Sequence, residues 1–336
     1  MNPATQEGTP FQLRSGAHSL RFRDLLHRLF SMANQGCLRQ EFLQRAGGSI
    51  LEFLGCDLLE VRLEEAGKAY RWRSGAAGLD PSAPALVERI IEAVLHGQAL
   101  AESPFSSRGG SIWTGDASQP IRLRDGARAE GQARSLVIGG EHLALACVPV
   151  PVDERRRGVL LLGYRQAGSL GREDVPFLEG LAETLGVAVA LQASQWALRE
   201  RVKELDCLYG IAQITQQPGL PLATQLAGIV GLLPPAWQYP DCTRARIALD
   251  DQEFATPGFG ATPWLQEATL RIGDRVRGRV QVAYDRPLPL FDEGPFLREE
   301  RSLIEEVAHQ VGLIVGRHED ALATAKLFHM LEQRRE

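Results

Sequence analysis

The sequence is poor in residues that could form reactive or metal-binding sulfur sites. Its 336 residues include five cysteines, and no two of them form a CxxC pair: Cys37, Cys56, Cys147, Cys207 and Cys242. An odd number of scattered cysteines argues against a disulfide framework and a cysteine-based zinc site. We therefore expect a cytoplasmic protein with no bound metal.

The sequence also lacks the short motifs of the common enzyme classes. It has no GxSxG, P-loop or HExxH motif, and the loop at Gly109-Gly110 has neither the lysine nor the following helix of a phosphate-binding loop. A net charge of −5 gives no electrostatic basis for binding nucleic acid or an anionic membrane. No apolar run reaches the roughly 18 residues of a membrane span. We expect a non-enzymatic protein without a cofactor.

The longest expected element is a helix over residues 174–217. Asp174 is a favourable N-cap, Pro176 lies in the first turn, and Pro218-Gly219 is a strong stop signal. A helix of about 40 residues is about 60 Å long, far more than one globular domain needs. The pattern therefore predicts a connector between two domains.

The middle of this helix carries a seven-residue apolar repeat, flanked by charged residues. Its members are Leu191, Leu198, Val202, Leu205, Tyr209 and Ala212. This spacing is typical of a coiled coil and predicts a parallel homodimer with Leu191, Leu198, Val202 and Leu205 in the seam. A single long core helix is the alternative. Gly186 and Gly210 weaken continuity, because glycine costs up to about 1 kcal/mol against alanine in a helix.

The segments on the two sides of the connector repeat one another. Residues 158–164 (GVLLLGY) match 278–284 at a shift of 120, and residues 181–190 match 307–316 at a shift of 126. We infer a tandem duplication of a module with antiparallel strands in its middle and helices at both ends. The predicted helices are 19–33, 39–54, 84–96, 222–233 and 296–331, and the predicted strands are 57–64, 70–73, 136–138, 143–150, 158–164, 243–249, 253–259, 268–272 and 276–284, with a loop at 103–131.

The first half resembles the GAF domain family over residues 20–195. The resemblance rests on Val148-Pro149-Val150, the run Gly158-Val159-Leu160-Leu161-Leu162, and Asp174 with Phe177-Leu178. In the second half, residues 232–240 (LLPPAWQYP) and 292–301 (DEGPFLREER) resemble a GAF-like sensory module found upstream of bacterial histidine kinases and of phosphoenolpyruvate/pyruvate-binding-domain proteins.

These resemblances imply an α+β fold of two GAF-like domains, each an antiparallel sheet with flanking helices, joined by the long connector helix. The expected boundaries are a disordered tail at 1–18, a first domain at 19–195, a second at 196–318 with a shared connector at about 175–216, and an output helix at 319–336. The chain lacks the ATP-binding boxes of a kinase, and His318-Glu319-Asp320 lacks the proline of a phosphoacceptor motif. We therefore expect the output domain to be absent or to lie on a separate chain, a kinase or another protein.

The strands of the second half carry the main candidate site. Alternation places Arg244 and Arg246 on one face of residues 243–249, and Arg277 on the polar face of 275–284. If these strands pair, one sheet face is basic, with Trp264 near its edge. Arginine binds carboxylate and phosphate bidentately, so we expect a small anionic ligand there. The alternative is a solvated face neutralised by Glu267, Asp250 and Asp251.

The first half offers weaker candidates. Trp72, Trp113, His142 and Cys147 fall near the position at which GAF domains enclose ligands, although Cys147 is expected to be an inert core thiol and His142 a hairpin residue. The corner Trp237-Gln238-Tyr239 is expected to be a packed loop plug.

The leading function is a sensory and dimerisation protein that binds a small ligand or partner and relays it through dimeric helices. The alternative is a scaffold whose pockets are filled by its own side chains, which a cavity large enough for a ligand would exclude. A thiol enzyme such as a methionine sulfoxide reductase would need clustered cysteines. We also expect the C-terminal helix to extend beyond its domain as a lever, continuing the repeat at His318, Ala321, Ala325 and Phe328.

Overall fold

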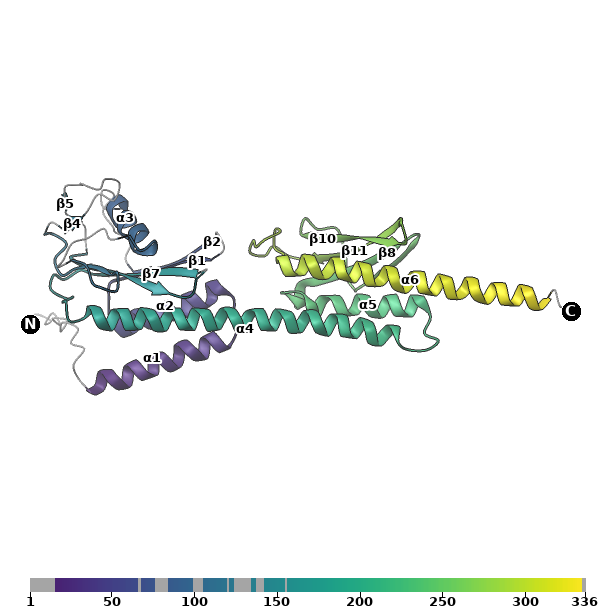
Figure 1. Ribbon diagram of the computed structural model, residues 1–336, viewed down its shortest axis with the longest axis horizontal. Coiled ribbons are helices and arrows are strands. Elements are labelled where there is room, and N and C mark those ends of the chain that lie inside the picture. The colour runs from purple at the N-terminus through teal and green to yellow at the C-terminus, as the bar shows by residue number, and fades with distance from the viewer. Residues whose placement is uncertain are drawn as a thin grey trace, which may run out of the picture. The chain divides into compact units, whose positions relative to one another are not determined.

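A computed structural model of the chain describes residues 16–65, 68–75, 84–98, 105–119, 121–123, 134–136, 142–154 and 156–333. The chain divides into two compact units, residues 1–196 and 197–336. Each unit combines helices with an antiparallel sheet, which confirms the predicted α+β class (Figure 1). The predicted N-terminal tail lies mostly outside the described residues.

Unit 1 is built on a five-stranded sheet with the strand order β2-β1-β7-β6-β3. Its described elements are α1 (Gly16–Asn34), α2 (Arg39–Leu54), β1 (Leu58–Glu65), β2 (Lys68–Gly75), α3 (Pro84–Leu95), β3 (Ile112–Thr114), β4 (Ile121–Leu123), β5 (Arg134–Leu136), β6 (Ala144–Pro151), β7 (Arg156–Tyr164) and the first half of α4 (Val175–Thr215). Strands β4 and β5 form a separate antiparallel pair. The loop predicted at 103–131 thus contains β3 and β4.

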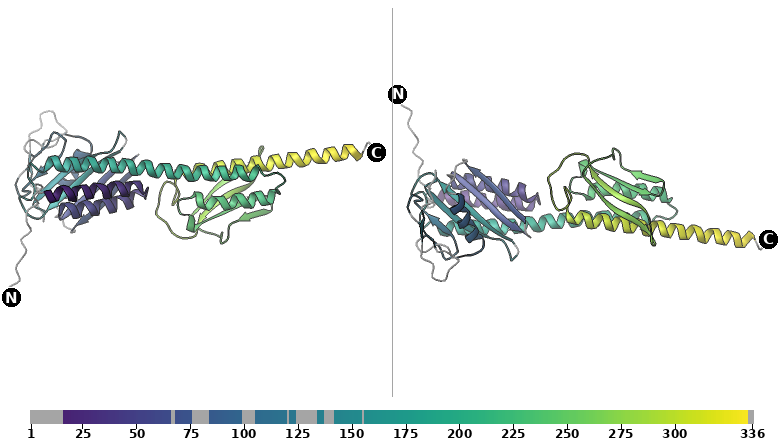
Figure 2. Two further views of the ribbon diagram at one scale, coloured as in Figure 1. Left: turned by 90° about the horizontal axis from the view of Figure 1, so that it is seen from below. Right: turned by 90° about the horizontal axis from the view of Figure 1, so that it is seen from above.

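Helices cover both faces of the sheet in unit 1. Leu160 and Leu162 of β7 pack on the side of α1, α2 and α4, which lie side by side in Figure 2, while Val159 and Leu161 pack under α3. A strand buried on both faces reads as a continuous apolar run, as GVLLLGY does.

Helix α4 is continuous from Val175 to Thr215, as the sequence predicted. Gly186 and Gly210, the two glycines that were expected to weaken its continuity, both lie within it. Gly186 packs so closely that a Cβ there would lie 1.9 Å from the carbonyl oxygen of Pro151, and a Cβ on Gly210 would lie 2.8 Å from Leu232 Cδ1. Glycine is required at position 186, where the close atom belongs to the backbone, whereas at position 210 the close atom is the end of a leucine side chain.

Unit 2 has a four-stranded sheet with the order β10-β11-β8-β9 and helices on one face. Its elements are the second half of α4, α5 (Leu222–Ala236), η1 (Pro240–Cys242), β8 (Thr243–Leu249), β9 (Gln252–Ala255), β10 (Leu265–Ile272), β11 (Arg275–Tyr284) and α6 (Arg298–Gln333). Two predictions need correction. Helix α5 includes Pro234 and Pro235, because both lie in its last turn, and β9 ends at Ala255 rather than at residue 259.

The two units share one topology. The order β2-β1-β7-β6 in unit 1 corresponds to β9-β8-β11-β10 in unit 2. The units differ between the second and third strands of this series, where unit 1 carries α3, β3, β4 and β5 and unit 2 has only residues 256–264. The outer face of the second sheet therefore has no counterpart of α3.

Candidate functional site

The predicted basic face of unit 2 exists, and four of its arginines, Arg244, Arg246, Arg277 and Arg279, form ion pairs. The pairing of Arg246 with Gln281 and of Ala248 with Arg279 places these side chains on the outer face of the sheet. Arg246 Nε donates to Gln281 Oε1 at 2.8 Å, and its guanidinium lies 4.8 Å from the centre of the Phe259 ring. Gln281 Nε2 in turn donates to Glu267 Oε2 at 2.9 Å.

Two other predicted site residues, Arg244 and Arg277, bind carboxylates at different positions of unit 2. Arg244 forms an ion pair with Asp285 at 2.6 Å. Arg277 bridges Asp250 and Glu319, at 2.5 Å to each, and so reaches α6 at the end of the sheet. These bonds, with Asp250 the stronger contributor, raise the pKa of Arg277.

Trp264 lies one residue before β10 and packs against the core of unit 2, because strand alternation turns it inward. The prediction placed Trp264 at the edge of the basic face, and this is corrected. Arg244, Arg246, Arg277 and Trp264 do not converge on one ligand position. The outer face therefore resembles the alternative given in the sequence analysis, a solvated surface whose arginines are neutralised by acidic residues.

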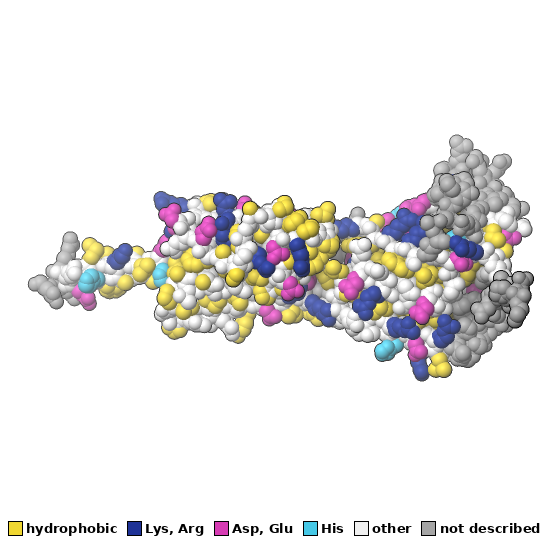
Figure 3. Space-filling view, turned by 180° about the vertical axis from the view of Figure 1, so that it is seen from behind, with side chains coloured by type: hydrophobic (Ala, Val, Ile, Leu, Met, Phe, Trp, Pro, Cys, Tyr) yellow, Lys and Arg dark blue, Asp and Glu magenta, His cyan; other side chains and the backbone are white. Residues whose placement is uncertain are grey.

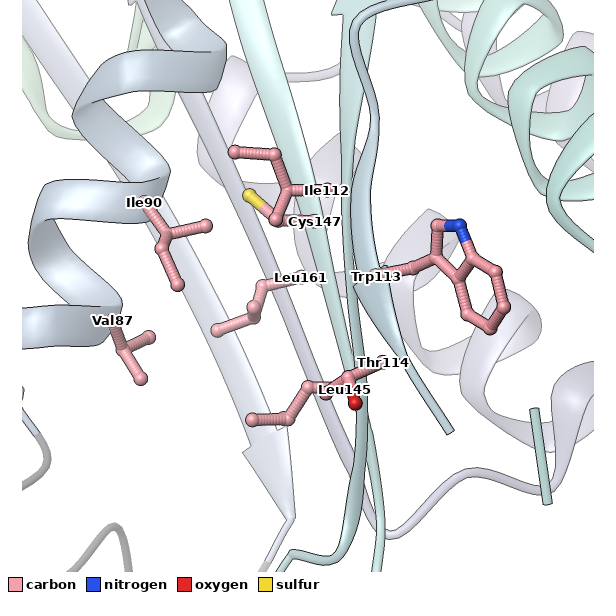
Figure 4. Close-up of a pocket in the computed structure, with 8 residues that line it drawn as sticks. All are labelled: Val87, Ile90, Ile112, Trp113, Thr114, Leu145, Cys147 and Leu161. Carbon is pink, nitrogen blue, oxygen red and sulfur yellow. The ribbon is translucent and has the colours of Figure 1, made fainter. Parts of the chain in front are cut away.

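Unit 1 has a small apolar cavity between α3 and its sheet (Figure 4). It is lined by Val87, Ile90, Ile112, Trp113, Thr114, Leu145, Cys147 and Leu161. The volume open to the centre of a water-sized sphere is about 10 Å³, which is room for about one water molecule. The side chains of unit 1 thus fill the space beneath α3.

The four candidates of the first half are separated by the sheet. Cys147 faces the cavity, whereas the indole of Trp113 points to the other side of β3 (Figure 4). Trp72 packs toward α2, where a Cβ on Gly47 would lie 2.2 Å from its ring. His142 is buried beside Gly163. Their expected gathering at one ligand position is therefore corrected. Burial raises the pKa of the Cys147 thiol, as expected for an inert core cysteine.

A charged cluster beneath α3 was missed by the sequence analysis. Glu60 is 1% exposed and forms ion pairs with Arg62 and Arg71, and its Oε1 lies 2.7 Å from Arg71 Nε. Arg62 also binds both oxygens of Glu88 on α3, and these bonds lower the pKa of Glu88. The sequence predicted only a strand at 57–64, and the contact of Arg62 with Glu88 of α3 depends on a helix that is distant in the sequence.

The predicted seam of α4 is an exposed apolar stripe. Leu198, Val202, Leu205 and Tyr209 are 58%, 47%, 51% and 66% exposed. At about 100° per residue they fall within an arc of roughly 60°, opposite the buried Cys207 and Ile211. Leu191 differs from the prediction, because it packs partly against the core of unit 1.

Helix α6 extends beyond its module, as the sequence predicted. Its buried residues end at Val315, and every residue from Glu319 to Gln333 is exposed. This segment, the α6 tail, is the narrow extension at the left of Figure 3 and carries hydrophobic side chains. Leu327, Phe328, Met330 and Leu331 are exposed there, as is Leu313 on the module itself.

The corner at Trp237 is a packed plug, as expected. Trp237 is fully buried and donates to Gln266 Oε1 at 3.2 Å. Nearby, the buried Glu300 in the first turn of α6 accepts the backbone N–H of Leu297 and of Gln238, at 2.8 and 2.7 Å. Glu300 therefore caps α6 and fixes the corner at once.

Comparison with known proteins gave no match to a family model and no match among curated proteins. Among solved structures, the chain is similar to bacteriophytochrome RpBphP3 from R. palustris, with 11% identity over 92% of this chain and 77% of the other, and a TM-score of 0.47. It is also similar to the free methionine-R-sulfoxide reductase from Neisseria meningitidis (15% identity, 55% and 98% covered, TM-score 0.35). A third is the phycoerythrobilin-bound GAF domain from a cyanobacterial phytochrome (10% identity, 52% and 96% covered, TM-score 0.35). With TM-scores below 0.5, these likenesses establish neither a family nor an activity.

Among the described residues, one helix meets the length and hydropathy of a membrane span. An 18-residue window of α4 has a mean hydropathy of 1.2, and half of that window is buried in the protein. Polar residues such as Glu179, Glu183 and Gln192 interrupt α4, so the sequence has no continuous apolar run of this length. The buried part of α4 in unit 1, which includes Leu181, Leu185 and Val189, packs in the core of that unit.

Proposed function

We propose that the protein is a non-enzymatic cytoplasmic sensory protein of two GAF-like modules, which relays a change through paired helices of a parallel homodimer. The observation that carries this proposal is the exposed stripe of Leu198, Val202, Leu205 and Tyr209. A seven-residue apolar spacing exposed on one side of a helix is the pattern that a second helix covers.

The α6 tail supports the same arrangement. At about 100° per residue, Leu313, Leu327 and Leu331 share one side of the helix, opposite the buried Ile304 and Val311. The module that holds α6 therefore cannot cover this side. In a parallel two-fold dimer, the stripe on α4 and the stripe on α6 each meet their own counterpart.

The two modules have different roles in this proposal. Unit 1 has a helix over its sheet and a cavity beneath it, so it is the input module. Unit 2 has an open, ion-paired sheet face and supplies the helices that pair. The α6 tail then acts on a separate output protein, which the sequence analysis expected to be a kinase or another signalling partner.

A scaffold that binds no small molecule is the second candidate. The cavity of about 10 Å³ favours it, because an organic ligand needs far more space. In this version the input is a partner protein that displaces α3.

Native mass spectrometry of the full chain purified from its own host tests the proposal. The relay function predicts two chains per particle, with a bound small molecule if unit 1 takes a ligand and none if it is a scaffold. A single chain per particle over the micromolar range would contradict the relay through paired helices.

A further inference from the structure

The loop that leads into β3 closes around a carboxylate from α4. Ser111 Oγ donates to Glu179 Oε1 at 2.6 Å, and Ser107 Oγ donates to the same oxygen. The loop is also tied to itself, because the backbone N–H of Ser107 donates to Ser111 O and that of Ser111 donates to Ser107 Oγ, both at 3.0 Å. Ser111 is fully buried. Its hydroxyl would lose its acceptor if Glu179 withdrew, and an unpaired buried polar group is costly.

The two glycines of this loop allow the loop to approach the Glu179 carboxylate. A Cβ on Gly109 would lie 2.5 Å from Glu179 Oε1, so a side chain there would displace the carboxylate. Gly110 has a φ of 88°, which favours glycine. From the sequence, this loop failed as a phosphate cradle. In the structure, its serines hold an anion that belongs to the chain itself.

The loop stands between the two layers of unit 1. Strand β3 is at the edge of the sheet, and Ile112, the residue after Ser111, lines the cavity under α3. Helix α4 lies on the opposite face, where Leu178 and Leu181 pack in the other core. The contact between Ser111 and Glu179 therefore joins the cavity side of the sheet to the connector helix around the edge of the sheet.

We propose that Glu179 is the coupling residue through which a change beneath α3 reaches α4. A ligand or side chain that enters the cavity would push Ile112 outward and shift the loop. This shift would break the hydrogen bonds from Ser107 and Ser111 to Glu179. The first turns of α4 would then lose their anchor on the cavity side. This inference rests on the proposed relay function and specifies its first step.

Hydrogen-exchange mass spectrometry of the full chain tests the anchor. Two variants break the contact by different routes, Glu179→Ala by removing the acceptor and Gly109→Ala by displacing it. Matched controls are Glu183→Ala, one turn further along and exposed, and Gly180→Ala, which has open space around its Cβ. We expect about tenfold faster exchange in both residues 105–113 and residues 176–186 for the two variants, and no such change in the controls. If the α4 segment exchanges at the wild-type rate in Gly109→Ala while the loop is faster, Glu179 anchors only the loop and the proposal is wrong.

A second comparison tests coupling itself. Ile112→Val removes one methylene at the cavity and should speed exchange in residues 176–186 by about threefold in the wild-type background. In the Gly109→Ala background it should have no further effect there, since the contact is already broken. Equal effects in both backgrounds would overturn the proposal. A monomeric wild type would instead overturn the dimeric relay and leave this result intact, so the two failures are distinguishable.

Discussion

Gly312 in unit 2 makes the same contact as Gly186 in unit 1. A Cβ on Gly312 would lie 2.1 Å from the carbonyl oxygen of Arg271, and a Cβ on Gly186 would lie 1.9 Å from that of Pro151. The two glycines match at the shift of 126 residues, and the two carbonyls match at the shift of 120 found in the sequence. The inferred duplication thus extends to a close helix–strand contact in each unit.

Alanine at either glycine should destabilise its own unit. Gly186→Ala and Gly312→Ala each force a methyl group against backbone, so we expect each to lower the free energy of unfolding by about 2–4 kcal/mol. Urea denaturation measures this loss. Gly180→Ala, in the same helix with open space, should be neutral or slightly stabilising. Equal effects at positions 180 and 186 would contradict the close-packing account.

The stability of unit 2 should depend on the protonation of Glu300. Burial raises the pKa of this carboxyl to about 7, although the Leu297 and Gln238 N–H groups and the Tyr284 hydroxyl act in the opposite direction. The folded-state pKa lies above the unfolded value, so the unfolding free energy decreases as pH rises from about 4.5 through 7. Between pH 5.5 and 7.5 this group should remove about 1–2 kcal/mol.

Glu300→Gln is the control for that titration, since other carboxyl groups also change charge over this range. Urea denaturation at pH 5.5 and pH 7.5 should show a smaller loss of stability in Glu300→Gln than in the wild type. Identical losses would mean that Glu300 is ionised throughout, stabilised by its three donors.

The outer-face arginines of unit 2 should differ in their contribution to stability. Arg244→Gln removes a partly exposed ion pair with Asp285, and we expect a change below about 0.5 kcal/mol. Arg246→Gln leaves the buried Gln281 Oε1 without its donor and should cost about 1–2 kcal/mol. Thermal unfolding of both variants measures these changes. The same experiment with added inorganic phosphate tests whether this face binds an anion. A rise of several degrees with phosphate that Arg244→Gln abolishes would restore the anionic-ligand hypothesis for this face.

The elements that the sequence predicted well are those whose pattern is set by local packing. The helix at 39–54 and the strand at 243–249 match the structure at both ends. The site was harder to predict. Arg277 has the same parity as the outer-face residues, yet at the end of the sheet it reaches Glu319 of a helix 42 residues away in the sequence. Glu60 is buried in β1, and its partner Arg62 is bound to Glu88 of α3, 26 residues further along the sequence. In both cases a distant element decides the environment, and strand periodicity does not carry that information.

The α6 tail should be dispensable for folding. None of the described residues from Glu319 to Gln333 is buried, so deletion of residues 320–336 should change the melting temperature of unit 2 by less than about 2 °C. Because this deletion keeps Glu319, it preserves the ion pair with Arg277. Calorimetry of the truncated chain checks this expectation. Loss of the unit 2 transition would show that the tail belongs to its core and is not a lever.

The central claim is that the exposed stripe of α4 is a dimer interface, and the mass of the particle tests it most directly. Light scattering should give twice the chain mass of 36.9 kDa for the wild type. Leu198→Glu combined with Leu205→Glu places charge in the seam and should give the mass of one chain, with both units still folded by circular dichroism. The control Arg199→Glu with Asp206→Lys changes exposed residues beside the stripe and should remain dimeric. A wild type with the mass of one chain, or a double glutamate variant that keeps twice that mass, would contradict the account.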